Sequence, residues 1–93
     1  MAYTELDLAQ VEKRVQAGER CVARQREILG QQIAAALPTE GALQLLAEFE
    51  AALSRLRRSR NHIRSQIAAA NTHRLMQSFW SLPQERRRSL AAG

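Results

Sequence analysis

The proline at position 38 is the feature that most constrains how this chain folds, because it separates two long stretches that both favour helices. Residues 4–37 contain no proline and are dominated by Glu, Gln, Arg, Ala and Leu, which are good helix formers. A proline pushes the preceding residue out of helical space, so the first helix is expected to end near Leu37. A connection as short as Leu37-Pro38-Thr39 makes two helices antiparallel, and the sequence therefore predicts an all-α hairpin.

Apolar residues recur along both stretches at the spacing of a single helix face. The first stripe consists of Leu8, Val11, Val15, Val22 and Leu29, with Ala36 completing the register. The second stripe alternates spacings of three and four, which favours a coiled-coil-like seam, and only Arg60 interrupts it. Its members are Leu46, Phe49, Leu53, Leu56, Ile63, Ile67 and Ala70.

Two residues on the first stripe are unusual for a core position. Gly18 costs helix stability but allows two backbones to approach closely. Gln25 places a polar side chain on the seam, where it fixes the register or pairs across a dimer.

Capping residues predict where the helices begin. Thr4 with Asp7 resembles a capping box, Thr39 is expected to cap the second helix, and Ser81 with Gln84 is expected to cap a third. We therefore predict a hairpin over 1–74, with helices of about 4–37 and 40–74. A C-terminal aromatic and basic segment follows over 75–93, with a short helix of about 82–90.

The charges support an antiparallel pairing. If the turn centres near residue 38, residue i of the first helix lies level with roughly residue 76 − i of the second. Acids then face bases along the whole hairpin, which fixes its orientation and register. The expected neighbours are Glu19 with Arg57 and Arg58, Glu12 with Arg64, Glu5 and Asp7 toward Arg74, and Arg24 and Arg26 with Glu48 and Glu50.

The chain is basic, with a formal charge of +5, and five arginines stand close together in the second stretch. One interpretation is that they contact the phosphates of a nucleic acid. The other is that they pair with carboxylates of the first helix, and the segment has no aromatic residues to stack on bases. The residues concerned are Arg55, Arg57, Arg58, Arg60 and Arg64.

The C-terminal segment combines Phe79 and the only tryptophan, Trp80, with Arg86, Arg87 and Arg88. Three interpretations stay open for it. The segment caps the open end of the bundle, it docks into a partner through the two aromatic anchors with the arginines on the rim, or it contacts a membrane interface.

Residue patterns for catalysis or cofactor binding are not found, so no enzyme, metal or cofactor is predicted. His62 and His73 lie about 16 Å apart along a helix, too far to share a metal, and are expected to be ordinary surface residues. The single cysteine, Cys21, flanks the apolar stripe and is expected to be buried or half-buried; it would cross-link two copies under oxidation if their first helices met. No signal peptide or membrane span is apparent, so a cytoplasmic protein is expected.

A bare hairpin buries little apolar surface for the number of residues it orders. We therefore expect a homo-oligomer, with two hairpins pairing into a four-helix bundle.

Two blocks of the sequence resemble a known group of proteins. Gly18-Glu19-Arg20-Cys21-Val22-Ala23-Arg24-Gln25-Arg26-Glu27-Ile28 and Leu45-Leu46-Ala47-Glu48-Phe49-Glu50-Ala51-Ala52-Leu53 are similar to segments of small, uncharacterised helical-hairpin proteins of α-proteobacteria. The resemblance covers about residues 8–65, and it implies a helical hairpin of bacterial origin without implying an activity. The turn and the Phe79-Trp80 segment depart from the pattern of the group.

Taken together, these patterns predict a non-enzymatic protein–protein interaction module, a small bacterial regulator or adaptor that associates with itself and with an unidentified protein. The alternative is an arginine-rich accessory protein that binds nucleic acid.

Overall fold

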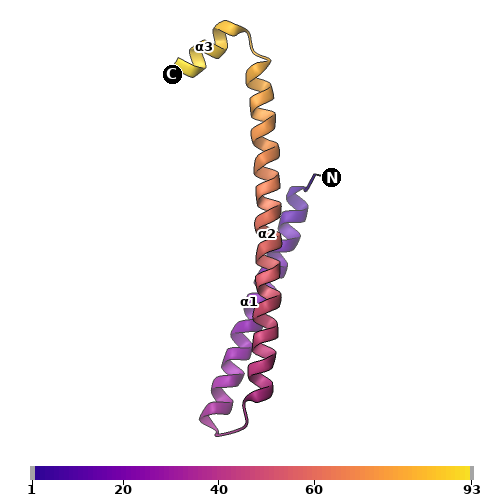
Figure 1. The fold of residues 1–93 in the computed structure, drawn as a ribbon, viewed down its shortest axis with the longest axis vertical. Coiled ribbons are helices and arrows are strands. Elements are labelled where there is room, and N and C mark those ends of the chain that lie inside the picture. Colours follow the sequence, from indigo (N-terminus) through magenta and orange to yellow (C-terminus); the bar gives the residue numbers. More distant parts are fainter. Residues whose placement is uncertain (1, 93) are drawn as a thin grey trace.

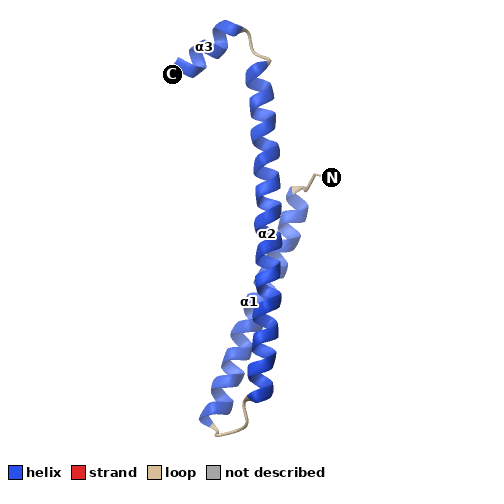
Figure 2. Ribbon diagram, viewed as in Figure 1, coloured by secondary structure: helices blue, strands red, loops and turns tan. Residues whose placement is uncertain are grey.

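The computed structural model describes residues 2–92, without the side chain of Ala92, and over this range it contains helices and no strands. Helix α1 spans Glu5–Ala34, α2 spans Glu40–Trp80 and α3 spans Gln84–Ala92 (Figure 2). α1 and α2 pack against each other in opposite directions, and α1 passes behind α2 in Figure 1. The predicted hairpin with a short C-terminal helix is confirmed.

The predicted helix bounds needed correction at four places, one of them the end of α3, which lies at Ala92 rather than 90. α1 ends at Ala34 rather than Leu37, and α3 begins at Gln84 rather than 82. α2 continues to Trp80, so the boundary predicted between residues 74 and 75 falls inside an unbroken helix. No helix-breaking residue occurs between Ala70 and Pro83, and α2 therefore continues although its seam pattern has stopped.

The start of α1 agrees with the sequence. The Thr4 hydroxyl accepts a hydrogen bond from the Asp7 backbone N–H at 3.2 Å, and the Asp7 carboxylate accepts one from the Thr4 N–H at 2.8 Å. This capping box satisfies two backbone groups that the first turn would leave without partners.

The end of α1 depends on Ala36, which the sequence pattern placed inside the helix. Ala36 has a φ of 57°, in the left-handed region, and therefore lies outside the helix whose stripe it was expected to complete. Its N–H donates to the Ile33 carbonyl at 3.1 Å, and the Leu37 N–H donates to the Gln32 carbonyl at 2.9 Å. These two bonds form a Schellman motif, which turns the chain before Pro38.

The other two predicted caps are not formed as expected. Thr39 is the N-cap residue of α2, but its side chain makes no capping hydrogen bond. The Ser81 hydroxyl donates to the Ser78 carbonyl at 2.8 Å, so this side chain belongs to the end of α2 and does not cap α3. The reason is that α3 begins only after Pro83, two residues beyond Ser81.

The core is a narrow seam between α1 and α2. Its centre is formed by Val15, Val22 and Leu53, with the partly buried Leu46, Phe49 and Leu56 packed around it. Val11 and Ile63 extend the seam toward the N-terminus of α1, and the half-buried Arg60 interrupts it as predicted. Both helices follow a heptad spacing of four and three residues along this seam, typical of helices that pack side by side.

Gly18 of α1 lies directly against side chains of α2. A Cβ atom added to Gly18 would lie 3.1 Å from Cδ1 of Leu53 and 3.6 Å from Cδ1 of Leu56. Ordinary carbon contacts are about 3.5–4.0 Å. The predicted role of this glycine in close approach is therefore confirmed.

Gln25 is buried in the same seam, with 5% of its surface exposed. Its Nε2 donates a hydrogen bond at 3.1 Å to the Ala42 carbonyl, in the first turn of α2. The side chain therefore joins the two helices of one hairpin, which supports its predicted role in setting the register.

The overall shape is long and thin. The chain measures 75 × 29 × 15 Å with a radius of gyration of 22.6 Å, whereas a compact chain of this length has one of about 12 Å. α1 has 30 residues and α2 has 41, which correspond to lengths of about 45 and 62 Å. α2 therefore projects beyond the N-terminus of α1, and α3 bends away at its far end (Figure 1).

Candidate interaction surfaces

One long edge of the hairpin carries a row of ion pairs, which we call the paired edge. Three pairs join α1 to α2, and in each the two residue numbers add up to 76, as the predicted register requires. The N···O distances are 2.8 Å for Arg64–Glu12, 3.7 Å for Arg57–Glu19 and 3.1 Å for Arg26–Glu50. Each pair is about half exposed and is worth roughly 0–1 kcal/mol, so the row acts mainly on register.

Other expected pairs are not formed among the described residues. Asp7 is engaged in the capping box with Thr4, and Arg74 donates instead to Asn71, one turn away on α2. Arg24 and Glu48 do not meet either, because they point outward rather than along the paired edge. The sequence predicted which residues lie at the same height along the hairpin. Which of them form ion pairs depends on the side of the helix that each residue occupies.

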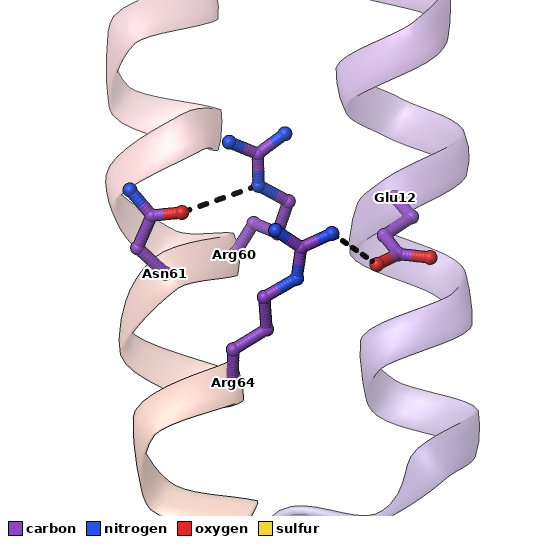
Figure 3. Close-up of polar contacts among 4 residues, drawn as sticks. All are labelled: Glu12, Arg60, Asn61 and Arg64. Atoms are coloured by element: carbon purple, nitrogen blue, oxygen red, sulfur yellow. Dashed lines mark hydrogen bonds and ion pairs between the residues drawn. The ribbon is translucent and has the colours of Figure 1, made fainter. Parts of the chain in front are cut away.

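The five clustered arginines do not form a single surface. Arg57 and Arg64 are in ion pairs of the paired edge, and Arg60 lies between them in a groove that Glu12 and Glu19 also line. Figure 3 shows Arg60 and Arg64 extending from α2 into the space between the helices. Arg64 reaches Glu12, while the Arg60 Nε donates to Asn61 at 3.3 Å.

Arg60 makes no ion pair among the described residues but is half-buried in the groove, which leaves Arg55 and Arg58 as the exposed members of the cluster without an ion pair. Both are exposed and lie three positions apart on the outward side of α2. A nucleic acid would therefore meet two free arginines on this side of α2 rather than five.

Cys21 is exposed, and the expectation that it would be buried or half-buried was wrong. The next residue, Val22, occupies the seam position, so the side chain of Cys21 points about 100° away from the seam. A residue flanking the stripe of a two-helix hairpin is covered only if a further layer packs there.

The histidines and other ligand-forming residues do not come together. His62 lies edge-on to Tyr3 with ring centroids 5.8 Å apart, and His73 is exposed. Among the described residues, no group of three or more His, Cys, Asp or Glu side chains could hold a metal ion. No helix in the described part of the chain is both long and apolar enough to cross a membrane.

The end of α2 and the bent α3, residues 71–92, form a surface that we call the C-terminal hook. Leu75 is 71% exposed, Trp80 61% and Met76 49%, so this segment does not cover the hairpin of its own chain. At about 100° per residue, the mean direction of these side chains and Phe79 lies about 170° around α2 from that of Ile63 and Ile67 of the seam, with Leu75 about 80° from Ile67. The apolar side chains of α2 therefore lie on a different side of the helix in the part that α1 does not cover.

The hook has an aromatic and cationic centre. The Phe79 and Trp80 rings meet edge to face at 5.5 Å, and the Arg87 guanidinium lies 5.2 Å from the centre of the Trp80 ring. This cation–π contact holds α3 against the end of α2. Arg86 and Arg88 are exposed on either side of it.

The structure thus brings Phe79, Trp80, Arg87 and Arg88 together around one groove, with Gln84 and Ala91. Arg86 lies outside this groove, beside Leu82 and Leu90. The contact between Arg87 and Trp80 crosses the turn at Pro83, and no periodic pattern in the sequence indicated it.

Comparisons with protein-family models, with curated proteins and with solved structures found no match to this chain. The resemblance to α-proteobacterial hairpin proteins therefore stays a prediction.

Proposed function

We propose that this chain is a non-enzymatic protein–protein interaction module, in which the hairpin is a rigid stem and the C-terminal hook binds a partner protein. The observation that carries the proposal is the exposure of Leu75, Met76 and Trp80 on a helix that continues beyond its covering helix. Aromatic anchors with arginines on the rim are typical of the centres of protein interfaces. A small bacterial regulator or adaptor in the cytoplasm fits this description.

The charge of the hook indicates the chemistry of the partner. Residues 71–92 contain four arginines and a single acid, Glu85, beside the exposed apolar side chains. An amphipathic helix with acidic residues flanking its apolar face would match both features. We therefore expect an acidic amphipathic segment as the ligand of the hook.

Trp80 offers a direct test, because it is the only tryptophan of the chain and its fluorescence reports on the hook alone. The full chain is titrated with a synthetic amphipathic peptide of Leu and Glu, and with a matched peptide in which Lys replaces Glu. We expect a saturable blue shift with the acidic peptide only. Reversing two rim charges, Arg86→Glu with Arg88→Glu, is expected to weaken binding about tenfold or more.

The matched control reverses two exposed arginines outside the hook, Arg55→Glu with Arg58→Glu, and should leave the titration unchanged. Equal responses to both peptides, or no response to either, would contradict the proposal. A shift with vesicles of anionic lipid and none with the acidic peptide would favour the membrane interpretation instead.

The alternative function, nucleic-acid binding, rests on the exposed Arg55 and Arg58. A salt titration of binding to duplex DNA and to RNA tests it, because phosphate contacts give affinities that fall steeply with salt. Absence of binding at low salt, or a slope near zero, would dismiss it. Binding retained after all five clustered arginines are changed to Gln would also count against it.

A further inference from the structure

The two long edges of the hairpin differ in chemistry. On the paired edge, positions repeating every seven residues are charged on both helices and form the three ion pairs. The equivalent positions on the opposite edge carry no charge from Cys21 to the turn on α1 or from the turn to Ser59 on α2, whereas Arg14, one heptad before Cys21, is charged. We call this the open edge, and its residues are Cys21 and Ile28 of α1 and Leu45, Ala52 and Ser59 of α2.

The side chains of the open edge are small or apolar and lie beside incompletely covered seam residues. Ile28 and Ala52 are half-buried, and Leu45, Cys21 and Ser59 are exposed. Behind them, Leu46, Phe49 and Leu56 of the seam are also only partly buried. Helices with apolar residues only at the two seam positions suit a pair, whereas helices that add a flanking position to that face suit a bundle.

We infer that a second copy of this chain packs against the open edge, so that two hairpins form a four-helix bundle. The paired edge is unsuited to this contact, because its three ion pairs would lose solvent on being covered. Small residues such as Cys21, Ala52 and Ser59 would let the two hairpins approach closely. The surface involved is separate from the C-terminal hook.

The solvent-exposed area of the chain supports the packing of a second copy against it. The chain exposes 7446 Å², whereas a compact monomer of 10.5 kDa exposes about 5,400 Å². The excess is roughly 2,000 Å² for each chain, or about 4,000 Å² for two, and the open edge accounts for part of it, because the total includes the C-terminal hook. Interfaces of obligate homodimers bury about 2,000–5,000 Å². Moreover, no large side chain of the hairpin is fully enclosed among the described residues, so the seam alone makes a small core.

The test measures the mass of the full chain in solution by light scattering and sedimentation, with a reductant present so that no disulfide contributes. We expect twice the chain mass of 10.5 kDa for the wild type. Cys21→Glu, alone and with Ala52→Glu, places charge on the open edge and is expected to weaken dimerisation at least about tenfold. Cys21 is exposed within one hairpin, so its substitution leaves the seam intact.

The matched controls place the same charge on exposed alanines away from the open edge, with Ala23→Glu on the paired-edge side of α1 and Ala51→Glu on the outward side of α2. They should remain dimers, and circular dichroism should show all variants helical at high concentration. A wild-type mass of 10.5 kDa at the highest soluble concentration would overturn the inference. So would a dimer that survives Cys21→Glu with Ala52→Glu, or one that Ala51→Glu disrupts equally. The Trp80 titration on the same variants reports on the hook independently.

Discussion

Replacing each of two glycines of α1 by alanine separates helix propensity from packing. Gly18 and Gly30 lie in the same helix, and alanine is about 1 kcal/mol more favourable than glycine in a helix interior. Nothing lies within 4 Å of a Cβ added at Gly30, so Gly30→Ala should realise the whole gain. For a domain of this size the midpoint of thermal unfolding would then rise by about 4–8 °C.

At Gly18 the same methyl group meets the core. It would lie 3.1 Å from Cδ1 of Leu53, a buried side chain held by Val15 and Val22. Overpacking a well-filled core costs about 1–3 kcal/mol, which equals or exceeds the propensity gain. We therefore expect Gly18→Ala to leave the midpoint unchanged or to lower it, in contrast to Gly30→Ala.

A double-mutant cycle identifies the clash as the cause. Leu53→Val removes the δ-carbons, so it should cost less free energy of unfolding in the Gly18→Ala background than in the wild type, by about 0.5–3 kcal/mol. Thermal unfolding followed by circular dichroism, at one protein concentration, measures all four proteins. Equal stabilisation by Gly18→Ala and Gly30→Ala would refute the close approach, and strict additivity would refute the role of Leu53.

Three further substitutions test local features by urea unfolding. Ala36→Gly should stabilise the chain by roughly 0.5–1 kcal/mol, because glycine adopts the left-handed φ of 57° without a Cβ penalty; destabilisation would contradict the Schellman turn. Gln25→Ala should cost about 1–2 kcal/mol through the lost hydrogen bond to Ala42, whereas Gln25→Leu should be nearly neutral; equal costs would argue against this bond. Thr4→Ala should cost about 1 kcal/mol by removing the cap of α1, and an unchanged midpoint would show that the first turn does not contribute to the free energy of unfolding.

Much of the hairpin could be predicted from the sequence because its contacts are local or periodic. The turn near Pro38, the capping box at Thr4 and the role of Gly18 each follow from one residue and its neighbours. The register followed from matching charges across an antiparallel pair, and three ion pairs confirm it. These features need no knowledge of distant parts of the chain.

The candidate interaction surfaces were less predictable. The sequence singled out Phe79 and Trp80, but it did not indicate that α2 would carry them beyond α1 or that Arg87 would lie over Trp80. The first outcome depends on the lengths of α1 and α2, and the second depends on how α3 turns after Pro83. The five clustered arginines looked like one site because they are close in sequence, yet the helix directs them to different sides.

The amino-acid sequence alone determined that this chain forms two antiparallel helices with one apolar seam and one register, because helix periodicity, proline and charge act at fixed spacings. The tertiary structure decided which flanking residues are covered. Cys21 is exposed and Leu75 uncovered because a two-helix hairpin has no second layer and α1 is shorter than α2. Burial at such positions is a property of the neighbouring helix, or of its absence, and residue spacing does not encode it.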